Sequence, residues 1–372
     1  MRILRVAQKL YPDTKGGGQY HVHAMSRDQA AMGHDVTVLT TRDDESLPRI
    51  EETHGYTVVR VSPGVTIAGN DVSPAVARYL WGVDAESFDV IHAHSHLYFS
   101  TNLAALKRRL GDIPLAITNH GLYSQSAPEW VFDLYLKTLG RWTFNRADVV
   151  FCYTETDEQR LRDLGIETRI DVVSNGIDTE RFTPEGPESD LIASDGPVVL
   201  FVGRLVEGKR PSIAVSSFAD LLSEHPDAEL VFCGDGPLRE ELEQQATDLG
   251  IDDAVTFLGH VSYDAMPEVY RSSDVLLLPS RAEGVPRTVL ESMSSGIPVV
   301  VNELDQMAGV VGDGGHIVDV GDREETVSAL SSGLDASALG KRGRERVTGD
   351  YRWLDTVDRT TAALESLVDD NS

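Results

Sequence analysis

One stretch of this chain decides its fold: Val275–Val301, which reads VLLLPSRAEGVPRTVLESMSSGIPVVV. Its apolar start, Val275–Leu278, predicts a buried strand, and Pro298–Val301 at its end predicts another. Between them, Pro286 suits the first turn of a helix that stops near Gly296. A strand, a helix and a second strand in this order are typical of a parallel sheet, which binds ligands at the carboxyl ends of its strands.

The same alternation of short apolar runs and helix-like stretches continues along the whole chain. Many of the runs are rich in Val and Ile with little polar alternation, as expected for parallel strands buried on both faces. The first series of expected strands is Ile3–Ala7, Val36–Thr40, Thr57–Val61, Val90–Ala93, Leu115–Asn119, Val149–Tyr153 and Ile170–Val173. The second series is Val198–Val202, Glu229–Cys233, Val255–Leu258, Val275–Leu278, Pro298–Val301 and Gly315–Val318. The sequence therefore predicts an α/β fold with doubly wound parallel sheets.

The two series are separated by a segment with the composition of a linker. Residues 175–197 contain Thr-Pro and Gly-Pro steps and several acidic residues. We therefore expect a first α/β domain over residues 1–185 and a second over residues 186–350. The last stretch, residues 351–372, has helical periodicity and no strand after it.

Composition excludes several classes of protein. Of the 372 residues, 41% are hydrophobic and 25% are charged, which is globular composition. No apolar run approaches the roughly 18 residues that a membrane span needs. The net charge of −27 excludes nucleic acid as a natural partner, because phosphate contacts need clustered Lys and Arg. Acidic residues are spread along the whole chain, which favours adaptation to molar salt, as in an extreme halophile, over a surface for a cationic partner.

Two further features suggest where the protein works. The apolar stretch at the start of the chain is too short for a signal peptide and reads as the first strand. Cys152 and Cys233 sit in separate apolar runs, so two buried thiols in a reducing cytosol are favoured over a disulfide. We therefore expect a cytoplasmic protein.

The loop before the helix of the opening stretch carries residues that suggest chemistry. Glu283, Gly284 and Val285 lie in this loop, and Glu291 lies about one turn inside the helix. Free amides at the start of the helix form an anion site with a favourable dipole. Two carboxylates that flank this site can hold hydroxyls on either side of a diphosphate. The alternative makes Glu283 a solvated loop charge and Glu291 an ordinary surface residue.

A second group of charges follows the expected strand Val198–Val202. Arg204 and Lys209 come after Gly203, and two cations at the carboxyl end of a strand suit a diphosphate leaving group. The spacing from Gly203 to Lys209 also matches most of a P-loop. A P-loop needs Ser or Thr next, to bind magnesium, and Arg210 stands there. The sequence therefore favours a diphosphate site over an NTPase site.

Glycines and histidines mark the first half of the chain. Gly16–Gly18 follow the first strand, where they either let the backbone approach a ligand closely or form a plain loop. His120 lies just past a strand, where a ligand-binding residue is expected, although a lone His is more often packed or solvated. His92, His94 and His96 alternate at a strand end and project to one face, but no cysteine or paired carboxylate nearby completes a zinc site.

Taken together, these motifs resemble the retaining, nucleotide-sugar-dependent glycosyltransferases of family 4, which have the GT-B fold. The resemblance covers nearly the whole chain and rests on the order and spacing of the motifs. They are Gly16–Gly18, Asp89–His94, Asn119–Gly121, Asn175–Asp178, Gly203–Arg204 with Lys209, Gly234–Pro237 and Glu283–Glu291. The resemblance implies two Rossmann-like domains that face each other across a cleft. The second would bind the donor, and the final helix would cross back to the first, acceptor-side domain.

The resemblance also implies roles for residues that match the family's motifs. Arg204 and Lys209 should contact the donor diphosphate. Glu291 should bind the ribose hydroxyls, and Glu283 should face hydroxyls of the transferred sugar, which His120 should reach from the first domain. The other implied donor-binding residues are Gly17 and Gly18 near the diphosphate, His260 and Val261 at the base, and Gly284 and Val285 in the loop.

The mechanism that the resemblance implies needs no metal and no cofactor beyond the nucleotide sugar. Retention in this family is explained by front-face attack, in which the departing phosphate oxygen takes the acceptor proton. The chain has no Asp-x-Asp, the carboxylate pair with which one class of sugar transferases binds metal. Arg210 departs from the family, which often has Gly after the paired lysine, and this puts the local backbone shape in doubt.

Other classes of protein remain as alternatives at this point. The imperfect glycine fingerprint and the second α/β half disfavour a Rossmann dehydrogenase. A non-catalytic sugar-nucleotide-binding protein would be expected to have lost Lys209, Glu283 or His120, and all three are present. A sugar-nucleotide epimerase of the GT-B fold stays open.

For the acceptor we expect a lipid-linked sugar or a polyisoprenyl phosphate at the cytoplasmic face of the membrane, as in the synthesis of surface glycans and glycoproteins. Lys107–Arg109 and Lys137–Arg146 concentrate cations in the first domain, and the second segment includes Trp142 and Phe144. This mixture suits a membrane interface. The alternative places both aromatic side chains in the core and the cations at helix ends. A soluble acceptor, as in sucrose or trehalose synthesis, also stays open.

Overall fold

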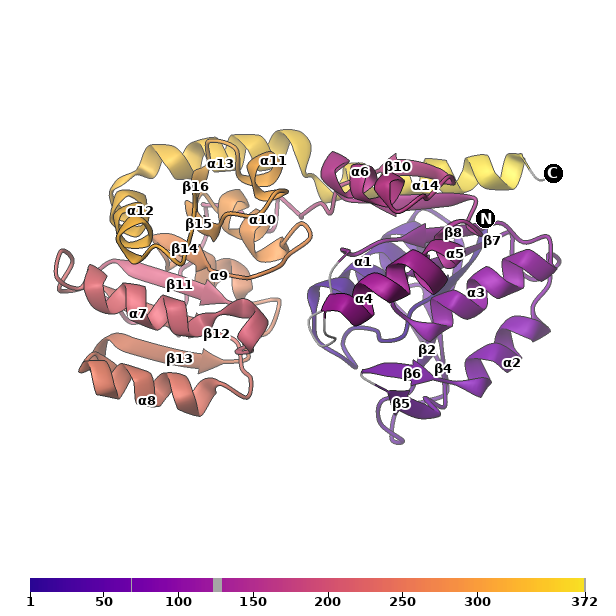
Figure 1. The fold of residues 1–372 in the computed structure, drawn as a ribbon, viewed down its shortest axis with the longest axis horizontal. Coiled ribbons are helices and arrows are strands. Elements are labelled where there is room, and N and C mark those ends of the chain that lie inside the picture. Colours follow the sequence, from indigo (N-terminus) through magenta and orange to yellow (C-terminus); the bar gives the residue numbers. More distant parts are fainter. Residues whose placement is uncertain (68, 123–128, 371–372) are drawn as a thin grey trace. The chain divides into compact units, whose positions relative to one another are not determined.

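A computed structural model describes residues 1–67, 69–122 and 129–370, and the chain forms two compact units (Figure 1). Unit 1 consists of Met1–Ser174 together with Thr356–Ser372, and unit 2 consists of Asn175–Asp355. The chain therefore enters unit 2 before the expected boundary at residue 185, and it returns to unit 1 after the expected boundary at residue 350.

Unit 1 is built on a sheet of eight strands in the order β10-β9-β8-β7-β1-β2-β4-β3. Neighbouring strands are parallel except for β3 and β4. The strands are β1 (Arg2–Val6), β2 (Asp35–Thr41), β3 (Ile50–Thr53), β4 (Tyr56–Val61), β7 (Val90–His94), β8 (Leu115–Thr118), β9 (Val149–Cys152) and β10 (Arg169–Val172), and a separate hairpin pairs β5 (Val65–Ile67) with β6 (Asn70–Val72). All strands expected in the first series are confirmed, whereas β3 and the hairpin are additional.

The helices of unit 1 cover both faces of this sheet (Figure 1). They are α1 (Gly17–Ala31), α2 (Pro74–Gly82), α3 (Phe99–Leu110), α4 (Glu129–Tyr135), the π-helical η1 (Leu136–Gly140), α5 (Arg141–Phe144) and α6 (Glu155–Asp163). Ser73 begins α2 by accepting a hydrogen bond from the amide of Val76 at 3.2 Å, and Thr154 begins α6 in the same way. Such caps satisfy amides that a helix start leaves unpaired.

The core of unit 1 includes the end of the chain. Helix α14 (Trp353–Asp369) starts in unit 2, but Ala363, Leu364 and Leu367 are buried beside Ile3 in the core of unit 1. Leu4, the next residue of β1, belongs to the core on the opposite face of the sheet. Both faces of β1 are therefore buried, as its apolar sequence predicts.

Unit 2 contains a parallel sheet of six strands in the order β13-β12-β11-β14-β15-β16. The strands are β11 (Val198–Val202), β12 (Glu229–Cys233), β13 (Val255–Gly259), β14 (Val275–Leu278), β15 (Val299–Asn302) and β16 (Gly315–Val318). The helices are α7 (Pro211–Leu221), α8 (Arg239–Leu249), α9 (Met266–Arg271), α10 (Arg287–Ser294), α11 (Met307–Val311), α12 (Arg323–Asp335) and α13 (Ser337–Asp350), with short 3₁₀ turns η2 (Glu207–Lys209) and η3 (Asp252–Ala254). All strands expected in the second series are confirmed.

Each sheet has one point at which the strand order reverses. In unit 1, β1 lies between β2 and β7, and in unit 2, β11 lies between β12 and β14. The chain builds one side of the sheet outward from the first strand and then returns to build the other side. In open α/β sheets the crevice at the carboxyl ends of the strands beside such a switch point is where ligands bind. The fold therefore marks one candidate ligand-binding edge in each unit.

Two expectations drawn from composition can be compared with the fold. Among the described residues, no helix is long and apolar enough to cross a membrane. Cys152 and Cys233 are free and buried, as expected, and burial raises the pKa of each thiol to about 12.

The interpretation of Trp142 and Phe144 as membrane-facing side chains is wrong. Phe144 is completely buried in the core of unit 1, and the partly buried Trp142 packs against the same cluster. Lys107 and Arg108 lie in the last turn of α3, where they bind the carbonyl oxygen of Val83 and the carboxylate of Asp148. The alternative, core aromatics and cations at a helix end, describes these residues.

Candidate active site

The switch point of unit 2 gathers most of the predicted donor-binding residues. Gly203 directly follows β11, and the loop after it leads through Arg204 to Lys209 in η2. The next strand along the chain, β12, ends in a loop that packs closely against this one. A Cβ atom on Gly234 would lie 2.0 Å from the carbonyl oxygen of Gly203, so only glycine permits this contact. The glycines of the Gly234–Pro237 motif therefore allow the two loops to pack closely.

Lys209 and Glu283 form a buried ion pair at this switch point. The side chain of Lys209 is 15% exposed and that of Glu283 is 7% exposed. A backbone hydrogen bond of 2.9 Å from Arg281 to Gly208 joins the two loops that carry them. Arg204 is exposed on the first of these loops. The structure thus brings together two residues separated by more than seventy positions, and Glu283 is not a solvated loop charge.

Arg210 adopts a left-handed backbone conformation, with φ 49° and ψ 47°, immediately before α7. This region costs a non-glycine residue about 1 kcal/mol, whereas glycine adopts it without this cost. The backbone therefore keeps a shape that suits Gly even though the side chain is Arg.

Side-chain amides hold the loop between β14 and α10 from several directions. Asn175 donates to the carbonyl oxygen of Val285 at 3.3 Å, and Gln306 donates to that of Glu283. Glu283, Gly284 and Val285 are all buried. Helix α10 starts at Arg287, so the expected first-turn residue Pro286 is its N-cap. The first amides of α10 point away from the helix body, as an anion site requires.

Glu291 is buried inside α10, which excludes the alternative of an ordinary surface residue. The hydroxyl of Tyr270 donates to Oε2 of Glu291 at 2.9 Å, and Nε of Arg287 lies 3.6 Å from Oε1. Arg287 also donates to the hydroxyl of Tyr263 at 2.8 Å. Burial raises the pKa of Glu291, and the charge of Arg287 opposes this shift. Tyr263 and Tyr270 are site residues that the sequence analysis missed.

His260 and Val261 follow the last residue of β13. His260 is exposed and Val261 is buried. Gly259 accepts a hydrogen bond from the amide of Gly234 at 2.8 Å, so this segment lies beside the loop after β12. The segment is thus at the same edge of the sheet as Lys209.

The carboxyl edge of the unit 1 sheet carries the remaining predicted residues. Gly17 and Gly18 start α1, soon after β1, and His120 follows β8. A Cβ atom on Gly18 would lie 3.9 Å from Nδ1 of His120. The ring nitrogens of His120 lie 2.6 Å from the hydroxyl of Tyr153 and 3.2 Å from Nδ1 of His94. Desolvation lowers the pKa of His120 to about 4, so this ring is neutral at physiological pH.

The three alternating histidines do not share one face. The rings of His92 and His94 are 4.4 Å apart, but Ser95 has a positive φ of 65°, which turns the chain. His96 instead lies 4.8 Å from the ring of Phe144 in the core. Over the described ranges no group of His, Cys, Asp and Glu could hold a metal ion. The zinc alternative thus finds no support there.

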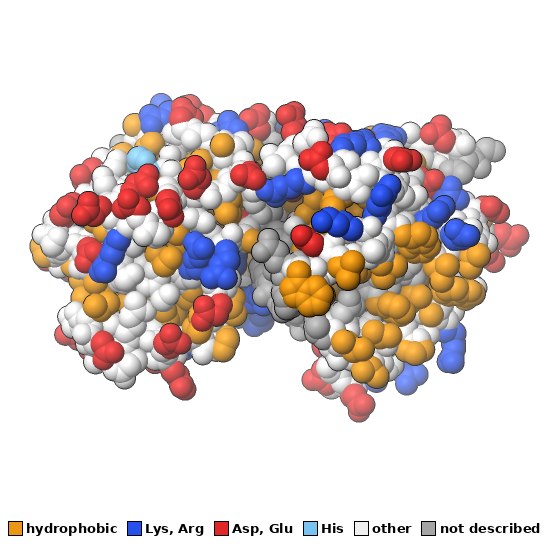
Figure 2. All heavy atoms as spheres, in the orientation of Figure 1, with side chains coloured by type: hydrophobic (Ala, Val, Ile, Leu, Met, Phe, Trp, Pro, Cys, Tyr) orange, Lys and Arg blue, Asp and Glu red, His pale blue; other side chains and the backbone are white. Residues whose placement is uncertain are grey.

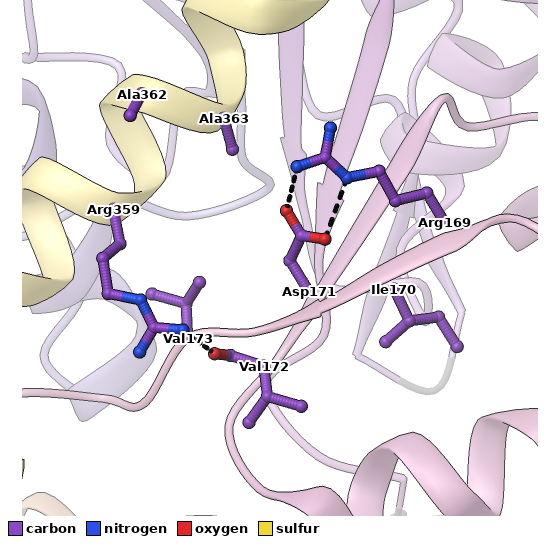
Figure 3. A pocket seen from close by; sticks show the side chains of 8 residues that line it. All are labelled: Arg169, Ile170, Asp171, Val172, Val173, Arg359, Ala362 and Ala363. Carbon is purple, nitrogen blue, oxygen red and sulfur yellow. Dashed lines mark hydrogen bonds and ion pairs between the residues drawn. The ribbon is translucent and has the colours of Figure 1, made fainter.

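A cavity of about 510 Å³ lies elsewhere in unit 1, between β10 and the middle of α14 (Figure 3). Arg169 makes two hydrogen bonds to Asp171, and Arg359 donates to the carbonyl oxygen of Val172 at 2.7 Å. The remaining lining residues are apolar. All of the lining residues differ from the predicted site residues, and the charges of both arginines are directed to partners within the wall.

Comparison with known proteins identifies the family. Residues 15–181 match the family model "Glycosyltransferase Family 4", and residues 183–346 match "Glycosyl transferases group 1". The D-inositol 3-phosphate glycosyltransferase of Acidothermus cellulolyticus is 31% identical, over 92% of this chain and 84% of that protein.

Solved structures agree with this assignment. Sucrose-phosphate synthase from Thermosynechococcus elongatus has a TM-score of 0.84 at 21% identity, with 98% of each chain covered. Anabaena HepE in complex with UDP-glucose has a TM-score of 0.77 at 19% identity, covering 98% of this chain and 100% of that one. With its two parallel-sheet units this chain has the GT-B fold. It belongs to glycosyltransferase family 4 and is an enzyme that transfers a sugar.

Proposed function

We propose that this enzyme moves a hexose from a nucleotide-diphosphate sugar to an acceptor with retention of anomeric configuration. The observation that carries the proposal is the buried ion pair of Lys209 and Glu283 at the switch point of unit 2. It sets a cation suited to a diphosphate beside a carboxylate suited to sugar hydroxyls. A site with one of these groups alone would fit many phosphate ligands, whereas the pair fits a sugar joined to a diphosphate.

In this proposal each part of the donor has its own partners. Arg204, Lys209 and the first amides of α10 hold the diphosphate. Glu283, with the backbone of Gly284 and Val285, holds the sugar. Glu291 binds the ribose. A carboxylate fixed by Tyr270 and Arg287 can accept a diol without losing its orientation. The HepE neighbour was solved with UDP-glucose, which supports a nucleotide sugar as the donor class.

The remaining predicted contacts belong to the same proposal. The backbone around His260 and Val261 meets the base. His120 donates to a hydroxyl of the transferred sugar, and Gly17 and Gly18 let the backbone come close to the diphosphate.

Catalysis in this scheme needs positioning and charge stabilisation rather than a protein nucleophile. The bond between the anomeric carbon and the phosphate oxygen breaks while the acceptor oxygen bonds to the same face. The acceptor proton passes to the departing phosphate oxygen. Arg204, Lys209 and the amides of α10 stabilise the growing negative charge. Because these groups can neutralise a diphosphate, activity should survive EDTA, and restoration by magnesium or manganese after complete loss would contradict the scheme.

The donor is testable by thermal shift. Nucleotide sugars that differ in base and sugar should be titrated in molar potassium chloride, because a ligand bound to the folded state raises its melting temperature. We expect one nucleotide sugar to raise it clearly more than its free nucleotide. If none does, and no sugar is transferred, the proposed donor class is wrong.

For the acceptor we propose a lipid-linked sugar or polyisoprenyl phosphate, with Trp130 and Leu134 in place of the aromatic residues that the sequence suggested. Trp130 on α4 is 72% exposed, Leu134 is 57% exposed, and Lys137 and Arg141 are exposed on the turns that follow. Figure 2 shows hydrophobic side chains with Lys and Arg among them on the face of unit 1 that carries α2, α3 and α4. In a chain of net charge −27 this mixture suits an anionic bilayer surface.

Flotation on liposomes in high salt tests the acceptor proposal. The double variant Trp130→Ser/Leu134→Ser should stay at the bottom of the gradient, while the wild type floats with vesicles that contain anionic lipid. The matched control is Leu191→Ser/Leu249→Ser, which removes two exposed leucines from unit 2. If the wild type does not float and water-soluble sugars are glycosylated efficiently, the acceptor is soluble.

A further inference from the structure

The ring of His120 is held by side chains from three different elements. Tyr153, directly after β9, lies 2.6 Å from its Nδ1, and His94, at the end of β7, lies 3.2 Å from its Nε2. The ring of His21 on α1 packs against it edge-on at 5.3 Å. Both polar atoms of the imidazole are therefore engaged, and its faces are also packed. These contacts restrain the orientation of the His120 ring more than folding of the protein requires.

A buried cation lies behind these rings. Arg5 is completely buried in β1, and the partners that the structure gives its guanidinium are all neutral: Ser26, Gln29 and His92. The guanidinium can only donate, so Nδ1 of His92 accepts. The proton of His92 is then on Nε2, which donates to the hydroxyl of Thr118 at 2.8 Å.

This arrangement keeps the neighbouring histidines uncharged. Burial lowers the pKa of His94 well below its usual value, and the charge of Arg5 adds to the shift. His120 is neutral for the same main reason, burial. A neutral imidazole carries one N–H, so the hydrogen bond at one nitrogen decides which nitrogen carries the proton.

The contact with Tyr153 decides the tautomer of His120. A phenol hydroxyl is a stronger acid than a neutral imidazole N–H, and an imidazole nitrogen is a stronger base than a phenol oxygen. The bond therefore runs from the hydroxyl of Tyr153 to Nδ1 of His120. The proton of His120 is then on Nε2, where it donates to His94 at the longer distance of 3.2 Å. The shorter bond anchors the ring, and the longer one is the bond that a sugar hydroxyl can replace.

We infer that Tyr153 is a positioning residue for His120, which it fixes as the Nε2–H tautomer so that one N–H of constant direction is available to the transferred sugar. This inference rests on the proposed contact between His120 and the donor sugar. Tyr153 itself acts through His120 and needs no contact with substrate.

The first test is kinetic. Tyr153→Phe removes only the hydroxyl, and it should lower kcat about 10-fold, the usual lower end for loss of a supporting hydrogen bond, with the donor KM changed less than threefold. In a His120→Ala background the same change should have no further effect. The matched control is Tyr56→Phe, because Tyr56 is a buried tyrosine whose hydroxyl lies 2.8 Å from Nδ1 of His23. Its turnover should stay within twofold of the wild type.

The outcomes separate the inference from the function on which it rests. If His120→Ala keeps normal turnover, the proposed role of His120 fails. If His120→Ala loses turnover and Tyr153→Phe keeps it, the positioning role alone fails. If Tyr153→Phe lowers turnover by the same factor in the wild type and in the His120→Ala variant, the positioning role of Tyr153 is also overturned.

The second test needs no variant and holds even if Tyr153→Phe folds poorly. Nitrogen-15 NMR of the histidine side chains of the wild-type protein distinguishes a protonated ring nitrogen from one that accepts a hydrogen bond. We expect Nδ1 of His120 to be the acceptor and Nε2 to carry the proton between pH 6 and pH 8. A proton on Nδ1 would overturn the inference.

Discussion

At the switch point of unit 2, Lys209 and Glu283 meet as a buried ion pair, whereas the carboxyl edge of the unit 1 sheet holds the neutral ring of His120 after β8. Both edges have glycines that allow close packing, and both are reached by loops from the carboxyl ends of neighbouring strands. In unit 1, Arg5 is buried behind the histidines, and Lys9 in the loop after β1 is paired with Asp43 and Asp71. The two units therefore differ in what surrounds the predicted residues: an ion pair in unit 2, and neutral hydrogen-bonding rings around His120 in unit 1.

Acidification should have the largest effect on the difference between the units, because it protonates the neutral histidines of unit 1. The pKa values of His23 and His120 are lowered to about 4, so the unfolded state binds more protons than the folded state from about pH 6.5 down to pH 4. The free energy of unfolding therefore falls as the pH is lowered through this window, by about 2 kcal/mol at pH 5 for one such histidine. We expect unit 1 to lose amide protection at pH 5 before unit 2 does, as hydrogen exchange can measure after correction for intrinsic rates. Equal losses in the two units would contradict the contrast.

Removing a cation from unit 2 should have the next largest effect. Arg204→Ala or Lys209→Ala should each lower turnover about 10²–10³-fold, as expected when a group that stabilises transition-state charge is lost. Lys209→Ala also leaves the carboxylate of Glu283 buried and unpaired, so it should lower the free energy of unfolding by about 1–3 kcal/mol. Arg204 gives the comparison variant, because it is exposed and its loss should lower the free energy of unfolding less than the loss of Lys209 does. Near-normal turnover at saturating donor in either variant would refute the diphosphate assignment.

Glu291→Ala separates donor binding from turnover at the unit 2 site. Loss of a charged hydrogen-bonding group should weaken donor binding about 10- to 100-fold, with a smaller effect on turnover at saturation. Tyr270→Phe is the companion variant, because it removes the hydroxyl that orients Glu291 at 2.9 Å without removing the carboxylate. Its donor affinity should fall less. Calorimetry that gives an unchanged dissociation constant for Glu291→Ala would count against a ribose contact.

The smallest effect is expected at Arg210. Arg210→Gly should raise the free energy of unfolding by about 0.5–1 kcal/mol, because glycine removes the left-handed strain. Part of the stabilisation is lost because glycine gives the unfolded chain more conformational entropy. The comparison variant Arg210→Ala keeps the left-handed strain and removes the side chain beyond Cβ. Chemical denaturation of both variants measures their free energies of unfolding. If Arg210→Ala is as stable as Arg210→Gly, left-handed strain is not the cause.

The strands could be predicted because their cause is local. Runs such as Val198–Val202 are apolar on both faces, and such runs become buried parallel strands wherever the chain alternates with helices. The missed strands β3 and β5 have the opposite character. Ile50–Thr53 is short and has three polar residues out of four, and Val65–Ile67 is exposed throughout, so neither carries a burial signal.

Sequence motifs predicted individual residues of the site but not the contacts between them. Lys209 and Glu283 stand in motifs of their own, but their pairing depends on how two loops meet. Tyr270 was missed because its role comes from the packing of α9 against α10, and no spacing in the sequence encodes it. Arg5 did leave a signal: a charged residue inside the apolar strand RILRV is unusual, and it can be read as a buried cation with a special role.

The path of the chain through the two units sets an order for synthesis on the ribosome. Unit 2 is one continuous segment, Asn175–Asp355, so all of its sheet is made before the last core residues of unit 1. Unit 1 begins first but is completed after unit 2, because Ala363, Leu364 and Leu367 fill its core and follow all of unit 2 in the sequence. Until those residues emerge from the ribosome, an apolar face of the unit 1 core stays uncovered. Unit 1 can therefore be completed only after unit 2 has been synthesised.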